Sequence, residues 1–148
     1  MTPKQRFIEE YAVIVKQDVI WGDMDAFNHV NNTVYFRYFE DARMAFFEKT
    51  GVMQHMEATN IGPILASTQC QFRAPVSFPD HILIGARIKE ISEKRFTMEY
   101  GVFSEQHDTL AAKGEGMVVY YNYKLNESCE IPDEVRENFN QLQAAKHH

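Results

Sequence analysis

The residues best suited to chemistry in this chain lie between positions 23 and 32, where two carboxylates, one imidazole and three amides occur close together. They are Asp23, Asp25, Asn28, His29, Asn31 and Asn32. A carboxylate serves as a nucleophile or a general base, and an imidazole titrates near neutral pH. This stretch therefore predicts acid–base or nucleophilic chemistry on a loop, with capping of the loop backbone as the alternative role for Asp25.

Several of these side chains also have a purely structural interpretation. Asn28 and Asn31 are typical turn and helix-cap residues, because asparagine bonds nearby backbone groups and tolerates a left-handed backbone. Strand alternation points Asp23 away from Asp25, which favours a structural or supporting role for Asp23. His29 has no second catalytic partner visible in the sequence, so orienting the loop or a substrate is favoured over direct proton transfer.

The thiols and the remaining histidines give no sign of a metal or of a second nucleophile. Cys70 and Cys129 form no CxxC motif, and we expect both to be reduced. Cys70 lies in a predicted strand without an adjacent histidine, which favours a small apolar role. His55, His81 and His107 fall in separate segments without the spacing of metal ligands, so we expect no metal site.

A long aromatic helix is predicted directly after the polar loop. Apolar side chains recur with the period of a helix that packs on one face: Tyr35, Phe39, Ala42 and Phe46. We expect the helix to begin at residues 31–33 and to end near Lys49, with Gly51 as a left-handed cap. A salt bridge between Arg37 and Asp41 is expected on its wetter face. The first N–H groups of a helix lack intrahelical partners, so they favour an anion that develops beside them.

The rest of the chain predicts a sheet around this helix. A first strand is expected within residues 11–21, with one face formed by Val13, Val15, Val19 and Trp21. Four further strand-like runs cover residues 64–74, 81–91, 96–105 and 110–123, and the short gaps between them favour hairpins. Residues 132–145 predict a short C-terminal helix that starts with a proline. This order is α+β with a five-stranded, mainly antiparallel sheet.

Length and composition narrow the class of protein further. The 148 residues fit one domain, with a core over about residues 11–125. A net charge of −6 with scattered basic residues argues against a nucleic-acid partner. No apolar run is long enough to span a membrane, and the N-terminus does not resemble a secretory signal, so we expect a cytoplasmic protein. We set His147 and His148 aside as a tag remnant.

The segment DMDAFNHVNNTVYFRYFEDAR, residues 23–43, resembles the hotdog-fold acyl-CoA thioesterases of the 4-hydroxybenzoyl-CoA thioesterase type. The likeness extends over roughly residues 11–142 and includes QFRAPVSFPDHILI, residues 71–84. Its most specific part is Asp25 followed by HVNN and the aromatic helix. Some relatives have a glycine after the acidic motif, where this chain has Asn28 and His29.

The resemblance implies a hydrolase that cleaves acyl-CoA to a free acid and coenzyme A without a metal or organic cofactor. In this family the catalytic carboxylate matches Asp25, and the amide that polarises the thioester carbonyl lies near Asn32. Beside what the family implies, we place His29 in the candidate catalytic set, with orientation of the loop or the thioester as its favoured role, and we expect Asn28, Asn31, Tyr35, Ser67 and Thr68 to bind substrate. The family also implies a homodimer with one continuous sheet, or a homotetramer, with sites between protomers.

Three alternatives remain open on the same scaffold. A non-catalytic protein that binds acyl groups or acyl-CoA is one, and a hydratase or dehydratase of enoyl thioesters is another. Hydrolysis of acyl-carrier-protein thioesters is a variant of the leading hypothesis. For Asp25, direct attack and activation of a water molecule are both chemically reasonable.

Overall fold

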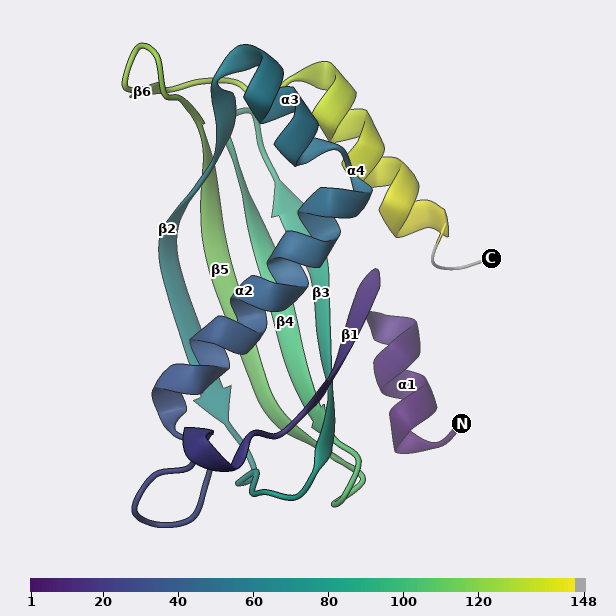
Figure 1. Cartoon of the computed structure of the whole chain (residues 1–148). Helices are drawn as coiled ribbons and strands as arrows, with labels where there is room; N and C mark the ends of the chain where they lie inside the picture. Colours follow the sequence, from purple (N-terminus) through teal and green to yellow (C-terminus); the bar gives the residue numbers. More distant parts are fainter. Residues whose placement is uncertain (146–148) are drawn as a thin grey trace.

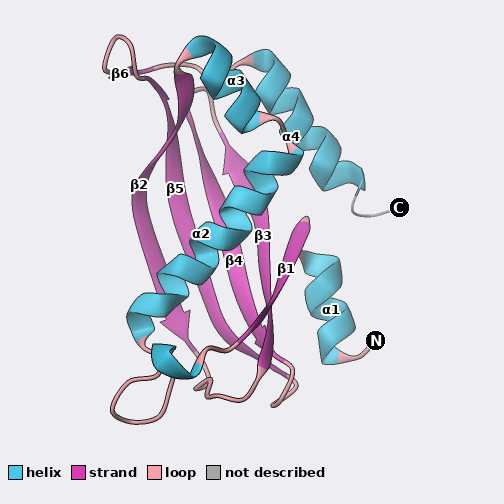
Figure 2. Cartoon of the chain, viewed as in Figure 1, coloured by secondary structure: helices cyan, strands magenta, loops and turns pink. Residues whose placement is uncertain are grey.

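The computed structural model describes residues 1–145, so His147 and His148 lie outside the described residues. An antiparallel sheet runs in the order β1-β3-β4-β5-β2, with the short β6 paired to β5. Its strands are β1 (Val13–Asp18), β2 (Ile61–Phe72), β3 (His81–Ile91), β4 (Arg95–Ser104), β5 (Thr109–Asn122) and β6 (Glu127–Ser128). One long helix, α2 (Asn32–Lys49), lies diagonally across one face of this sheet (Figures 1 and 2). The predicted α+β class, a long central helix against a mainly antiparallel sheet, is confirmed.

Aromatic packing holds α2 in the concave face of the sheet. The helix buries one broad stripe of apolar side chains: Val34, Tyr35, Tyr38, Phe39, Ala42, Phe46 and Phe47. Phe39 stacks on Tyr100 of β4 with ring centroids 4.9 Å apart. A Cβ atom at Gly114 of β5 would lie 2.4 Å from the Phe39 ring, so glycine is needed there for close approach. The predicted left-handed conformation of Gly51 is confirmed, with φ of 73°.

A helix that the sequence analysis missed, α1 (Pro3–Glu10), covers part of the opposite face of the sheet. Phe7 and Tyr11 form a second, smaller core there with Leu83 and Phe103. The helix begins with a capping box, in which Thr2 and Gln5 satisfy each other's backbone N–H groups. This T-x-x-Q pattern, with a proline at the first helical position, was the available sequence signal.

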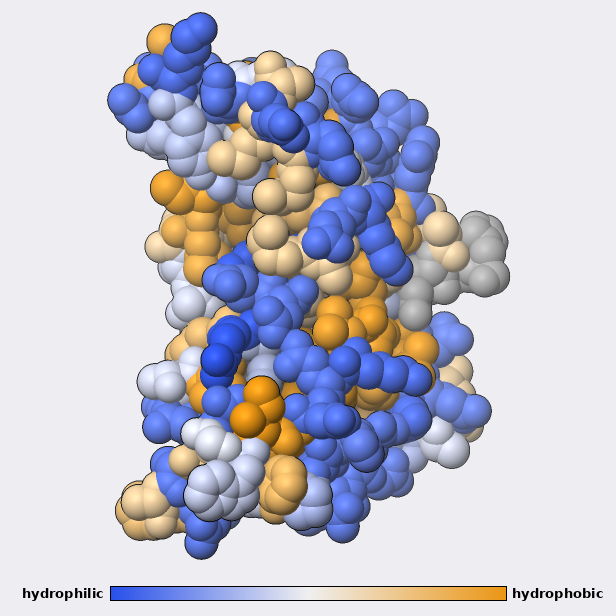
Figure 3. Space-filling model, in the orientation of Figure 1, coloured by the Kyte–Doolittle hydropathy of each residue, from blue (hydrophilic) through white to orange (hydrophobic). Residues whose placement is uncertain are grey.

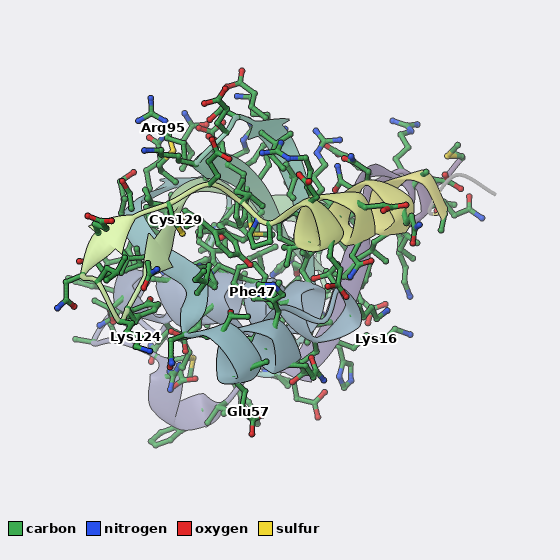
Figure 4. The ribbon with its side chains drawn as sticks, turned by 90° about the horizontal axis from the view of Figure 1, so that it is seen from above. Lys16, Phe47, Glu57, Arg95, Lys124 and Cys129 are labelled. Atoms are coloured by element: carbon green, nitrogen blue, oxygen red, sulfur yellow. The ribbon has the colours of Figure 1, made fainter. Side chains whose placement is uncertain are left out.

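Two further helices close the end of the molecule away from the polar loop. Residues 52–62 carried no predicted element, but they contain α3 (Val52–Thr59) and the start of β2. The predicted C-terminal helix is confirmed as α4 (Asp133–Ala145), and Asn138 donates a hydrogen bond to the Thr50 carbonyl at 3.0 Å. Seen from above in Figure 4, Phe47 lies in the interior between helices and sheet, whereas the labelled charged side chains lie at the periphery.

Two local predictions were wrong. Arg37 does not pair with Asp41; its guanidinium contacts Asp23 at 3.1 Å, and Asp41 accepts from Gln17 of β1 at 2.7 Å. Tertiary partners displaced the helical i,i+4 pair, which contributes only a few tenths of a kcal/mol on an exposed surface. Trp21 does not line a strand face; it begins a short 3₁₀ helix, η1 (Trp21–Asp23), and is 70% exposed.

Candidate active site

The polar loop between η1 and α2 is closed by its own first carboxylate. Asp25 accepts hydrogen bonds through Oδ1 from the backbone N–H of Phe27 at 2.9 Å and of His29 at 3.4 Å. Its own N–H donates to the His29 carbonyl at 2.8 Å. Oδ2 of Asp25 makes no hydrogen bond with any residue that the structure describes. Asp25 therefore caps the loop through one carboxylate oxygen and leaves the other free to react.

The first turn of α2 presents a free amide at Asn32. Asn31 is the N-cap, and its side chain accepts from the Thr33 N–H at 3.0 Å. The Val34 N–H reaches the Asn31 carbonyl at 3.0 Å, and the Asn31 N–H reaches the Asp23 carbonyl at 2.9 Å. Within residues 1–145 the N–H of Asn32 has no partner. This amide carries the partial positive charge of the helix start and is free to hold an oxyanion.

One cavity of about 340 Å³ brings the carboxylate and this amide together. It is lined by Asp25, His29, Val30, Asn32, Tyr35, Phe72, Arg73, Ala74 and Pro75. The first five residues come from the loop and α2, and the last four come from the end of β2 and the segment after it. Two hydrogen bonds connect these two walls. The Ser77 hydroxyl donates to the Asn28 carbonyl at 2.7 Å, and the Val30 N–H donates to the Val76 carbonyl at 2.7 Å.

The structure gathers some of the expected site residues and separates others. Asp25, His29, Asn32 and Tyr35 line the cavity. The remaining expected residues do not: Asn28 and Asn31 serve the turn and the helix cap, and Ser67 and Thr68 lie further along β2. Thr68 donates instead to the Glu115 carbonyl at 3.2 Å.

Phe72, Ala74 and Pro75 belong to the cavity but were absent from the expected site. Arg73 also lines the cavity and was not among the expected site residues. The motif QFRAPVSFPDHILI contains all four residues, so it was the signal that pointed to this wall. Arg73 forms no salt bridge within the described part of the chain, and its exposed guanidinium is the cation of the cavity.

Burial raises the pKa values of Tyr35, which lines the cavity, and of the nearby Cys70. Desolvation raises the pKa of Tyr35 to about 12, so its hydroxyl stays neutral, and its ring packs edge to face on Phe72 with ring centroids 5.0 Å apart. Desolvation also raises the pKa of the nearby Cys70 thiol to about 11, which makes Cys70 a poor nucleophile at neutral pH.

No group of three or more metal-ligating side chains is found among residues 1–145. Over the same residues, no helix is both long and apolar enough to cross a membrane. The lining of the candidate site supplies a carboxylate, an imidazole, a backbone amide and one guanidinium.

The sequence of this chain matches a known family over most of its length. Residues 19–139 match the family model of the thioesterase-like superfamily. The chain belongs to the thioesterase-like superfamily. This confirms the resemblance seen in the HVNN segment, and the helix within a curled sheet is its hotdog fold.

Three thioesterases are similar to this chain over most of its length. A thioesterase of Thermus thermophilus, solved with coenzyme A and Zn, is 26% identical with a TM-score of 0.80, over 90% of this chain and 96% of its own. The long-chain acyl-CoA thioesterase FadM of Escherichia coli (strain K12) is 24% identical over 119 residues, 80% of this chain and 90% of the relative. The chloroplastic acyl-acyl carrier protein thioesterase ATL3 of Arabidopsis thaliana is 27% identical over 119 residues, 79% of this chain and 62% of the relative.

Proposed function

We propose that this protein hydrolyses acyl-CoA thioesters to a free carboxylic acid and coenzyme A. The observation that carries the proposal is that the free oxygen of Asp25 and the unpaired N–H of Asn32 belong to residues that line one cavity. Thioester hydrolysis requires an attacking group and a donor for the oxygen that becomes negative. The family and the coenzyme A complex of the Thermus relative support this reaction class.

Each residue has a defined role in the reaction. The Asp25 carboxylate attacks the thioester carbonyl to form a mixed anhydride, or it takes a proton from a water molecule that attacks in its place. In both cases the carbonyl electrons move to oxygen, and the Asn32 N–H stabilises that oxyanion. The oxyanion collapses, the C–S bond breaks, and coenzyme A leaves as a thiolate that takes up a proton from the protonated Asp25 or from solvent. On the anhydride route a water molecule then hydrolyses the mixed anhydride, which releases the carboxylic acid and restores the Asp25 carboxylate. His29 orients the Asp25 loop, and Arg73 neutralises negative charge on the incoming substrate.

We further propose that the protein acts as a homodimer joined through β2. The two edges of the sheet differ: β1 has six residues and includes the charges of Lys16 and Asp18, whereas β2 has twelve residues and no charge. A long, uncharged and exposed edge strand is a template for pairing with another strand. Orange, apolar surface lies along this edge at the left of Figure 3. Pairing of β2 with its symmetry mate would form the continuous sheet that the family implies.

A panel of acyl-CoA esters, with release of free thiol as the readout, tests the reaction. We expect turnover with at least one ester, and a loss of about 10²–10⁴-fold in Asp25→Asn, which removes the charge but retains an oxygen that caps the loop. Asp108→Asn is the matched control, because Asp108 is an exposed turn residue with φ of 50°, a conformation that asparagine tolerates. Full activity of Asp25→Asn would remove Asp25 from the mechanism. Ligand-dependent thermal stabilisation without thiol release would identify a binding protein instead.

Acyl-carrier-protein thioesters are a second candidate substrate, favoured by the similarity to ATL3. The same acyl group presented on coenzyme A and on a carrier protein distinguishes the two. If coenzyme A is the carrier, we expect the higher kcat/KM with the CoA ester and a selective increase of its KM in Arg73→Gln. A higher kcat/KM with the carrier-protein ester would assign the second candidate.

A further inference from the structure

The concave side of β2 carries two exposed apolar residues that this chain leaves uncovered. Leu65 is 40% exposed and Phe72 is 50% exposed. Leu65 pairs with Val118 of the core, and a Cβ atom at Gly116 would lie 3.3 Å from Leu65 Cδ1, beside the Tyr100 hydroxyl. Phe72 packs on Tyr35 of α2. Both side chains therefore point to the face that holds α2 and the catalytic cavity.

Only one of these residues reaches the cavity of its own chain. Phe72 lines it, whereas Leu65 lies seven positions earlier in the same strand. At the rise of an extended strand this separation is roughly 20 Å, which no leucine side chain spans. Within one copy, Leu65 is not part of the site.

A second copy paired through β2 changes this geometry. In an antiparallel pair, directly opposed residues have their side chains on the same face of the sheet, whereas neighbours in sequence point to opposite faces. The two-fold axis of a symmetric pair must therefore pass beside one residue, which then lies opposite the same residue of the second copy. The exposed residues of β2 lie between Ile64 and Phe72, and without the bulge residue Ala66 the middle of this range falls between Thr68 and Gln69, so we place the axis at one of these two residues. Because Ala66 is an extra residue in the ladder with β5, counting skips it. Leu65 of the second copy then lies opposite Cys70 for an axis at Thr68.

An axis at Gln69 sets Leu65 of the second copy directly opposite Phe72. Opposed Cβ atoms are about 5 Å apart, and neighbours two positions along are about 7–8 Å apart. Phe72 lies directly opposite Leu65 of the second copy in the second register and diagonally beside it in the first, so in both registers Leu65 is within side-chain reach of the cavity wall formed by Phe72. We propose that Leu65 acts in trans: it closes the acyl end of the partner's catalytic cavity and limits the size of the acyl group. This inference rests on the proposed thioester hydrolysis and names the residue that sets its substrate range.

Acyl chain length provides the first test. Leu65→Ala should shift the kcat/KM profile toward longer acyl-CoA esters, and Leu65→Trp should lower kcat/KM for long esters by about tenfold or more. Ile64→Ala and Ile64→Trp are matched controls, because Ile64 is 42% exposed in the same strand but faces the other side of the sheet. Equal shifts in the Ile64 and Leu65 variants would show a general disturbance of the edge and would overturn the proposal.

Mixed dimers separate action in trans from action in cis. One subunit carries Asp25→Asn with Leu65 intact, the other carries Leu65→Trp with Asp25 intact, and two different tags isolate the mixed species. If Leu65 acts in trans, one of the two sites has both native residues, and long-chain turnover returns to about half of the wild-type rate per dimer. A mixed dimer that keeps the profile of Leu65→Trp would overturn the proposal.

Disulfide formation tests the geometry without any activity. Leu65→Cys should form a disulfide between copies, with the native Cys70 for an axis at Thr68 or with Phe72→Cys for an axis at Gln69. Ile64→Cys, on the other face, should form neither link. Absence of both links, or a monomer in solution, overturns the proposal whether or not the protein is active. Cross-linked dimers that release no thiol from any acyl-CoA would overturn the proposed function instead.

Discussion

The substitution Asn32→Pro should remove the proposed oxyanion donor and leave the fold intact. Proline has no N–H, and the first helical position tolerates it because that N–H makes no intrahelical bond. The residue before a proline must be extended, and Asn31 already is, with φ of −59° and ψ of 139°. The ring of Asn32→Pro occupies space beside the cavity that Asn32 lines. Asn32→Ala is the matched control, because it removes the side chain but keeps the amide.

The size of the effect follows from the chemistry of that single amide. Removal of one oxyanion-hole donor typically lowers kcat about 10²–10³-fold, or about 3–4 kcal/mol of barrier. We expect this loss in Asn32→Pro with a melting temperature close to wild type, and near-wild-type kcat in Asn32→Ala. Thiol release from the best acyl-CoA ester gives kcat, and circular dichroism gives the melting temperature. Wild-type kcat in Asn32→Pro would refute the reasoning, and an equal loss in Asn32→Ala would transfer the role to the side chain.

Three more predictions test other parts of the account. Asp25→Ala should be less stable than Asp25→Asn by about 1 kcal/mol, or roughly 2–4 °C in melting temperature, because only asparagine keeps an acceptor for the loop amides. Equal melting curves of the two variants would exclude the capping role of Asp25. Gly101→Ala should lower the free energy of unfolding in urea by about 1–3 kcal/mol, because its Cβ would lie 2.5 Å from the Tyr11 hydroxyl. Gly22→Ala is the control and should be neutral, because a Cβ there meets no atom within 4 Å. Equal effects of the two substitutions would contradict this packing. Burial raises the pKa of Cys70 to about 11, so the thiolate is scarce at pH 8. The rate of alkylation of Cys70 should therefore increase about tenfold per pH unit toward pH 11. An alkylation rate that is flat above pH 9 would contradict the raised pKa of this thiol.

Local signals in the sequence were sufficient for the elements that depend on nearby residues. The β3 strand was predicted with its observed bounds, His81–Ile91, because alternation and flanking turn residues mark both ends. The start of α2 followed from an asparagine cap, and its end followed from a glycine suited to left-handed backbone. The α1 helix was missed because eight mainly polar residues have weak periodicity, and packing of Phe7 and Tyr11 on the sheet stabilises them.

The sequence by itself determined the two groups on which the proposed chemistry depends, because Asp25 and the helix start at Asn32 lie close together in one continuous motif. Only the tertiary structure decided which other segment meets them. The wall from Phe72 to Pro75 comes much later in the chain, and sheet order and loop contacts bring it to the cavity. The exposure of Leu65 and Phe72 was likewise invisible in the sequence. Strand alternation fixes the face on which a side chain lies, but only the packed chain shows whether α2 extends far enough to cover it.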